Sequence, residues 1–165
     1  MILALDPSSS KVGYAVMRDL SPKGLVELGL LVPSPQSAPP LDRTRQLGTD
    51  LADLIQDHKR MIEAILIEVS LTPHGHANDH RAAATLGVYG LAVGYLLHVA
   101  ETQAGDIPIE TAEATIWTER KRKPDRTRWI SVFYGRAYLP EKDPGGDTAD
   151  AIGVGRWWLT RRGGK

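Results

Sequence analysis

Two short hydrophobic segments of this sequence each end in an acidic residue, which limits the folds that the chain can adopt. Residues 2–6 read Ile-Leu-Ala-Leu-Asp and residues 65–68 read Ile-Leu-Ile-Glu, a pattern typical of buried β-strands. Carboxylates are almost never fully buried unless they are paired or bind a metal. We therefore expect Asp6 and Glu68 to emerge at the edge of a sheet, where charged groups or cations compensate them.

The remaining sequence alternates between strand and helix patterns. Turn residues separate strand patterns at 12–16 and 25–32 from the first strand, which predicts an antiparallel meander of three strands. Leucine and isoleucine at helical spacing predict an amphipathic helix over 41–59. The other expected elements are a helix over 79–102, a fifth strand at 107–110 with an edge position, and helices near 112–118, 125–138 and 147–161.

This order of elements predicts an α/β fold in which residues 1–165 form one domain. If the helix over 41–59 returns the chain beside the first strand, the strands that carry Asp6 and Glu68 become parallel neighbours. Both acids then lie at the carboxyl edge of the sheet, where open α/β sheets place their sites. The chain has no cysteine, which excludes disulfides and thiolate metal sites and suits an intracellular protein.

A second pair of acids, Asp147 and Asp150, opens the last expected helix after the breaker Pro144-Gly145-Gly146. Their spacing places both on one face of the first turn. Asp147 is also open to a simpler interpretation, that of a helix cap. Four converging carboxylates would repel by roughly 4 kcal/mol per close pair at an effective dielectric constant near 20. Two Mg²⁺ ions, with Mn²⁺ as a substitute, would neutralise them and support phosphodiester hydrolysis.

Charge is distributed unevenly along a chain whose formal net charge is +0. Residues 1–117 carry 8 basic and 14 acidic side chains, whereas residues 118–165 carry 12 basic and 6 acidic ones. A basic region beside an acidic metal site suits a nucleic-acid substrate, although a charge run also suits a solvated helix face. The expected phosphate contacts are Arg120, Lys121, Lys123, Arg126 and Arg128.

Three ordered motifs give the sequence a resemblance to a known family. The motifs are Asp6-Pro7-x-Ser9-x-x-x-Gly13-Tyr14-x-Val16, Glu68 after Ile-Leu-Ile, and Asp147-x-x-Asp150-Ala151, with Leu86-Gly87 between the last two. They resemble the motifs of RuvC-type Holliday junction resolvases, a branch of the RNase H-like nuclease fold. The resemblance implies a five-stranded mixed sheet of order 3-2-1-4-5, flanked by helices, with the first three strands antiparallel.

The resemblance also implies an activity and its residues. It implies magnesium-dependent cleavage of four-way DNA junctions by a homodimer in DNA recombination and repair, in the cytoplasm of a bacterial or phage-infected cell. A branch-migration helicase as partner stays open. The implied catalytic and metal-binding residues are Asp6, Glu68, Asp147 and Asp150. Ser9 and Leu71 are further expected DNA contacts, and Leu71 stands where the family often has an aromatic residue. Ser8 stands where the family usually has glycine, and Arg126 corresponds to a family lysine near the metals, with Lys121 and Lys123 as nearby substitutes.

Two alternative functions stay open: a branched-DNA binding protein with weak nuclease activity, and an RNase H-like nuclease for other branched DNA or RNA. His74, His76 and His80 favour a solvent-facing or DNA-facing loop over a zinc site. Trp117 and Trp129 flank the basic cluster, so either base stacking or core packing is possible, while Trp157 and Trp158 are expected to pack on the sheet.

The uncharged segment 82–100 is long enough to cross a membrane, but its glycines and alanines favour a buried helix. Three of its glycines, Gly87, Gly90 and Gly94, would let another helix approach closely. We therefore expect this face to form a two-fold dimer.

Overall fold

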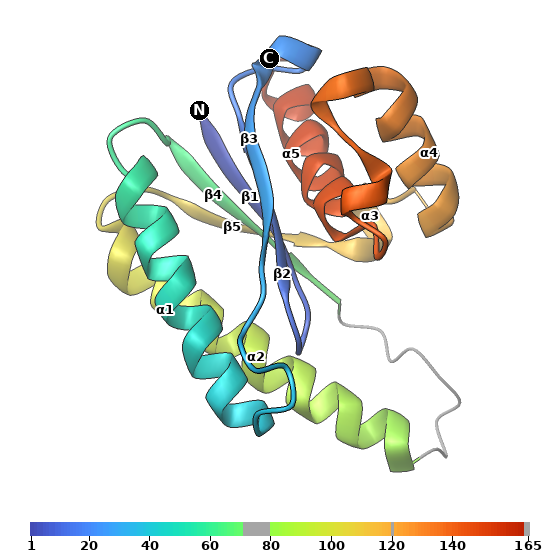
Figure 1. The fold of residues 1–165 in the computed structure, drawn as a ribbon. Coiled ribbons are helices and arrows are strands. Elements are labelled where there is room, and N and C mark those ends of the chain that lie inside the picture. The colour runs from blue at the N-terminus through green and yellow to red at the C-terminus, as the bar shows by residue number, and fades with distance from the viewer. Residues whose placement is uncertain (71–79, 120, 164–165) are drawn as a thin grey trace.

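The computed structural model describes residues 1–70, 80–119 and 121–163, with the side chains of residues 80–85 excepted. Its strands form a single sheet of order β3-β2-β1-β4-β5 (Figure 1). The strands are β1 (Ile2–Pro7), β2 (Val12–Met17), β3 (Leu25–Leu31), β4 (Ala64–Val69) and β5 (Ile109–Glu113). The α-helices are α1 (Pro40–His58), α2 (His80–Ala104), α3 (Ala114–Trp117), α4 (Lys123–Tyr134) and α5 (Asp147–Gly163). The expected α/β class and strand order are confirmed.

The pairing of the strands confirms the expected position of the two strand-end acids. β1 pairs antiparallel with β2, and β2 pairs antiparallel with β3, which gives the predicted meander. β1 pairs parallel with β4, with Leu5 opposite Ile67. The residues that follow this pair are Asp6 and Glu68, so both acids lie at the same carboxyl edge of the sheet.

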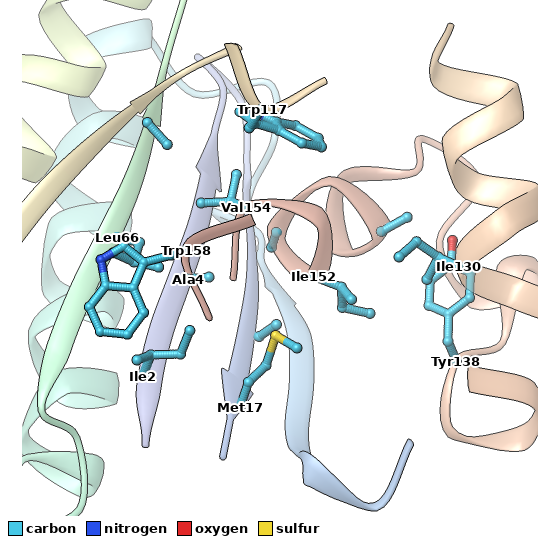
Figure 2. Packing of buried hydrophobic residues seen from close by; sticks show 14 of the residues in the cluster. Ile2, Ala4, Met17, Leu66, Trp117, Ile130, Tyr138, Ile152, Val154 and Trp158 are labelled. Atoms are coloured by element: carbon cyan, nitrogen blue, oxygen red, sulfur yellow. The ribbon is translucent and has the colours of Figure 1, made fainter. Parts of the chain in front are cut away.

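Helices cover both faces of the sheet, α1 and α2 on one side and α3, α4 and α5 on the other (Figure 1). Successive residues of a strand point to opposite faces. Accordingly Leu3 and Ile65 pack with the buried side chains of α1 and α2. Ile2 and Leu66 instead pack with those of α5, and Figure 2 shows them with Val154. The hydrophobic runs of β1 and β4 are continuous because both faces of these strands are covered.

Three expectations need correction. The fifth strand starts at Ile109, because Pro108 has no backbone N–H to donate to the strand pairing, and it extends to Glu113. Most of the helix expected near 112–118 is therefore the short α3. The helix expected over 125–138 ends at Tyr134, because Gly135 adopts a φ of 55°.

Helix α2 is buried on one face alone, which corrects the expectation of a buried helix. Ala92, Leu96 and Ala100 pack against the sheet and α1. The opposite face leaves Leu91 55% exposed. Within the described residues no helix is long and apolar enough to cross a membrane.

Candidate active site

The four predicted acids line one hollow of about 600 Å³ at the carboxyl edge of β1 and β4. Strand β1 supplies Asp6, strand β4 supplies Glu68, and the first turn of α5 supplies Asp147 and Asp150. Segments that are far apart in sequence thus deliver four carboxylates to one place. The convergence expected from the sequence is confirmed.

A glycine in β2 allows the start of α5 to reach this edge. Gly13 lies opposite Asp6 in the β1–β2 ladder. A methyl group added at Gly13 would overlap with the backbone carbonyl of Asp147. The absence of a side chain therefore lets the first turn of α5 contact the sheet directly beside Asp6.

Asp143, not Asp147, caps helix α5. Its Oδ1 accepts a hydrogen bond from the backbone N–H of Asp147 at 2.9 Å, and its Oδ2 accepts one from that of Ala149 at 3.1 Å. Oδ2 also accepts hydrogen bonds from the hydroxyls of Thr148 (2.6 Å) and Tyr138 (3.1 Å). Because Asp143 satisfies these N–H groups, the carboxylate of Asp147 is free to face the hollow. Asp143 was not among the residues predicted from the sequence, although its place before Pro-Gly-Gly was a usable signal.

Lys123 brings an ammonium group among three of the acids. Its Nζ lies 2.9 Å from Asp147 Oδ1, 3.1 Å from Asp150 Oδ2 and 4.0 Å from Asp6 Oδ2. On the other side, Lys11 forms an ion pair with Oδ2 of Asp147. The resemblance implied Lys123 as a nearby substitute for Arg126 at this position; in the structure both residues contact the acids.

Arg126 and Trp117 connect Glu68 of β4 to Asp150 of α5. The Arg126 guanidinium donates two hydrogen bonds of 2.9 Å to the carboxylate of Asp150. It also lies 5.0 Å from the centre of the Trp117 ring. The indole Nε1 of Trp117 in turn donates a 3.0 Å hydrogen bond to Oε2 of Glu68. Trp117 thus packs in the core, which was one of its two expected roles, and it also supports Glu68.

The electrostatics of the hollow indicate a shortage of positive charge near the strand-end acids. Burial, and then the negative charges of Glu68 and Asp150, raise the pKa of Asp6 well above its ordinary value. Burial and Asp150 raise the pKa of Glu68 to about 7, against the hydrogen bond from Trp117. Burial also opposes ionisation of Asp147, but hydrogen bonds from Lys11 and Lys123 lower the pKa of this acid below its ordinary value. Additional cations would therefore be bound most favourably near Asp6 and Glu68.

The chemistry of these donors fits divalent cations. Carboxylate oxygens are the ligands that Mg²⁺ and Mn²⁺ prefer. The ammonium of Lys123 already stands in for a cation between Asp6, Asp147 and Asp150. Within the described residues, no group of three or more acidic or histidine side chains is arranged to hold an ion as it stands. Lys123 and the carboxylates would have to rearrange for a metal to bind.

The other predicted contact residues lie at different distances from the acids. Ser9 lines the hollow together with Lys123 and Arg126. Lys121 is exposed, pairs with Glu119 at 2.9 Å and lines a second hollow, whereas Arg128 lines a third. Four of the other predicted residues lie outside the described residues: Arg120, Leu71, His74 and His76. The side chain of His80 also lies outside them. Tyr89 of α2, which the sequence analysis missed, lines the hollow and accepts a hydrogen bond of 2.9 Å from the backbone N–H of Ser70.

The strand order and the flanking helices define an RNase H-like fold of the RuvC type. The protein is similar over 99% of its chain to the structure "T. thermophilus RuvC in complex with Holliday junction substrate", with a TM-score of 0.67, 20% identity and 96% of that chain covered. It is similar to the "Thermus thermophilus RuvC structure" over the same shares of both chains, with a TM-score of 0.66 and 19% identity. No protein-family model and no curated protein matches the sequence. At this level of identity the likeness establishes the fold.

Proposed function

We propose that this protein is a metal-dependent endonuclease that cleaves four-way DNA junctions during recombination and repair. One observation carries the proposal: Asp6, Glu68, Asp147 and Asp150 line one hollow at the carboxyl edge of a RuvC-type sheet. The fold adds support for the substrate, because one structure with this fold is of a RuvC protein "in complex with Holliday junction substrate".

The four acids would hold two Mg²⁺ ions, with Mn²⁺ as a substitute. Bound there, the ions would supply an activated water and stabilise the leaving oxygen of the phosphodiester. Glu68, whose pKa is raised to about 7, binds a proton near neutral pH unless a cation replaces it. Asp147 is ionised over the same range, because Lys11 and Lys123 lower its pKa.

The basic residues of the hollow would bind the substrate's phosphates. Lys123 is 39% exposed at its side chain, so it can turn from the acids toward a phosphate oxygen. Arg126 is 16% exposed and is fixed by both oxygens of Asp150, so it orients that acid. Ser9 lies in the wall of the hollow and would donate its hydroxyl to the DNA backbone.

The open face of α2 supports a two-fold dimer as part of this proposal. A methyl group added at Gly87, Gly90 or Gly94 would meet nothing within 4 Å. Leu91, on the same face, is 55% exposed. Two copies that pack through this face would present two active sites to two DNA strands. We expect Leu91→Glu to convert a dimer into a monomer in sedimentation experiments, and a wild-type monomer at micromolar concentration would contradict the dimer.

A branched-DNA binding protein with weak nuclease activity is the second candidate. The contacts of Lys123 with three of the acids favour it, because they occupy oxygens that a metal would need. A lysine that stays in place when Mg²⁺ is added would leave binding without cleavage.

Substrate selection tests the proposed function. A four-way junction, a linear duplex of the same sequence and an RNA–DNA hybrid would each be incubated with the protein and Mg²⁺. Junction resolution predicts paired nicks in opposite strands of the junction and little cleavage of the other two substrates. Preferred cleavage of the hybrid would favour another RNase H-like activity, and binding to the junction without nicks would favour the second candidate.

A further inference from the structure

A second hollow of about 600 Å³ lies beside the active site and is bordered by α3, α4 and α5 together with Thr118, Glu119 and Lys121. The two hollows share Thr118 and Arg126 in their walls. Three of the four tryptophans of the chain line the second hollow: Trp117, Trp129 and Trp157. Among the described residues, its charged lining consists of Lys121, Arg126, Arg156 and Arg161, and the acids Glu119 and Asp125.

The aromatic surface of this hollow is exposed and held in place. Trp129 is 49% exposed and stacks on Phe133, with ring centres 5.4 Å apart and an angle of 18° between the planes. Arg156 lies 4.7 Å from the Trp129 ring centre and 4.3 Å from that of Phe133. The same guanidinium donates hydrogen bonds to the carbonyl of Leu20 (2.8 Å) and to the hydroxyl of Tyr134 (3.2 Å). An indole fixed in this way binds a flat ring with little further loss of side-chain entropy.

The charges of the hollow suit an anionic partner. Cations outnumber acids in its lining, and two of them, Lys121 and Arg161, are exposed. Arg161 lies 4.9 Å from the centre of the Trp157 ring, so a cation and an aromatic face occur together. Indoles interleaved with exposed cations match the alternation of base and phosphate in a nucleic-acid strand.

We propose that the second hollow binds an unpaired nucleotide of the DNA next to the cleavage site, with its base on Trp129 and its phosphate near Lys121 and Arg161. The proposal rests on the proposed nuclease function, because the shared residues Thr118 and Arg126 place this hollow directly beside that of the acids. An unpaired base fits and a paired one does not, since a base in a duplex has both faces covered by its neighbours. Stacking requires no particular base. The second hollow would therefore select unpaired over paired nucleotides and would not select a particular base sequence.

Binding of a short, fluorescein-labelled thymidine strand and of a labelled duplex of equal length tests this proposal. Fluorescence anisotropy would be measured in EDTA, so that no cleavage interferes. Trp129→Ala should weaken single-strand binding by about 10-fold, within the roughly 5- to 150-fold range known for loss of one base stack, and leave duplex binding unchanged. Trp129→Phe should keep most of the affinity, because a phenyl ring also stacks.

Val132→Ala is the matched control, because Val132 lies on the same helix and is 78% exposed but does not line the second hollow. Wild-type single-strand affinity in Trp129→Ala, or equal losses for single strand and duplex, would overturn the proposal. So would a change in oligomeric state, because Trp129 would then serve a protein interface. The result is independent of the nuclease assay, since a protein that cleaves no junction can still lose single-strand binding with Trp129.

Discussion

The indole of Trp117, which ends α3, donates a 3.0 Å hydrogen bond to the carboxylate of Glu68 at the end of β4. Trp117 is 8% exposed, and a methyl group added at Gly153 of α5 would overlap with its ring. The ring is therefore fixed by close packing against α5, and its hydrogen bond orients Glu68 toward Asp6 and Asp150.

Trp117→Phe should keep the packing and remove the hydrogen bond. A hydrogen bond to a charged group contributes about 1.5–3 kcal/mol, so the Mg²⁺ concentration for half-maximal cleavage should rise about 10-fold or more. The pKa of Glu68 should also rise further, which moves the pH–rate profile to higher pH. Trp158→Phe is the control, because Trp158 is also buried, at 7% exposed, but does not line the hollow of the acids. An unchanged Mg²⁺ requirement in Trp117→Phe would show that the bond has no positioning role.

Stability without metal should fall as pH rises. The pKa of Glu68 is about 7 in the folded protein, against an ordinary value of 4.5 in the unfolded chain. The pKa of Asp6 is also raised by folding. Between these values the unfolded chain releases protons that the folded protein retains, so the free energy of unfolding decreases between about pH 4.5 and pH 7. Asp147 has the opposite effect on the free energy of unfolding, because its pKa is lowered by folding. Its contribution falls at pH values below this range.

Mg²⁺ should reverse this loss, because it binds the ionised carboxylates. The increase in melting temperature on adding Mg²⁺ should be larger at about pH 8 than at about pH 5. Asp6→Asn serves as the control, since it removes one buried charge and should reduce both the pH dependence and the Mg²⁺ effect. Equal Mg²⁺ effects at the two pH values would contradict the assignment of these acids as ligands.

Gly13→Ala should damage both stability and activity. The added methyl group would press on the backbone of Asp147 and displace the first turn of α5. Such overpacking costs about 1–3 kcal/mol, which urea unfolding would measure, and cleavage should fall because Asp147 and Asp150 move together. Gly163→Ala, at the other end of α5, meets nothing within 4 Å and should affect neither. A Gly13→Ala protein with normal stability would show that the contact is not tight.

The acidic edge of the sheet could be predicted from the sequence because its signals are local. Uninterrupted hydrophobic runs identify β1 and β4. An acid at the end of such a buried strand is rarely tolerated without a compensating partner, so it indicates a functional site. The parallel pairing of the two strands then places Asp6 beside Glu68. The resemblance supplied the strand order, which no local pattern contains.

The supports of the site were predicted only in part, because most of them depend on contacts between distant segments. Asp143, which caps α5 from four residues before Asp147, is a local contact whose signal before Pro-Gly-Gly was not used. Trp117 meets Glu68 across 49 residues, and Lys123 meets Asp147 across 24. The glycines of α2 did indicate a face that another helix can approach, but an uncharged helix has the same composition whether its own chain or a partner covers it.

The most direct test of the account is single-turnover cleavage of a four-way junction by wild-type protein and Asp6→Asn, with junction binding measured on the same preparations. If the four acids form a metal-dependent cleavage site, the wild type nicks the junction when Mg²⁺ is added. Asp6→Asn should then bind the junction at least as tightly and cleave it at least about 100-fold more slowly. Cleavage by Asp6→Asn at the wild-type rate would contradict the account, as would wild-type protein that binds the junction and leaves it intact with both Mg²⁺ and Mn²⁺.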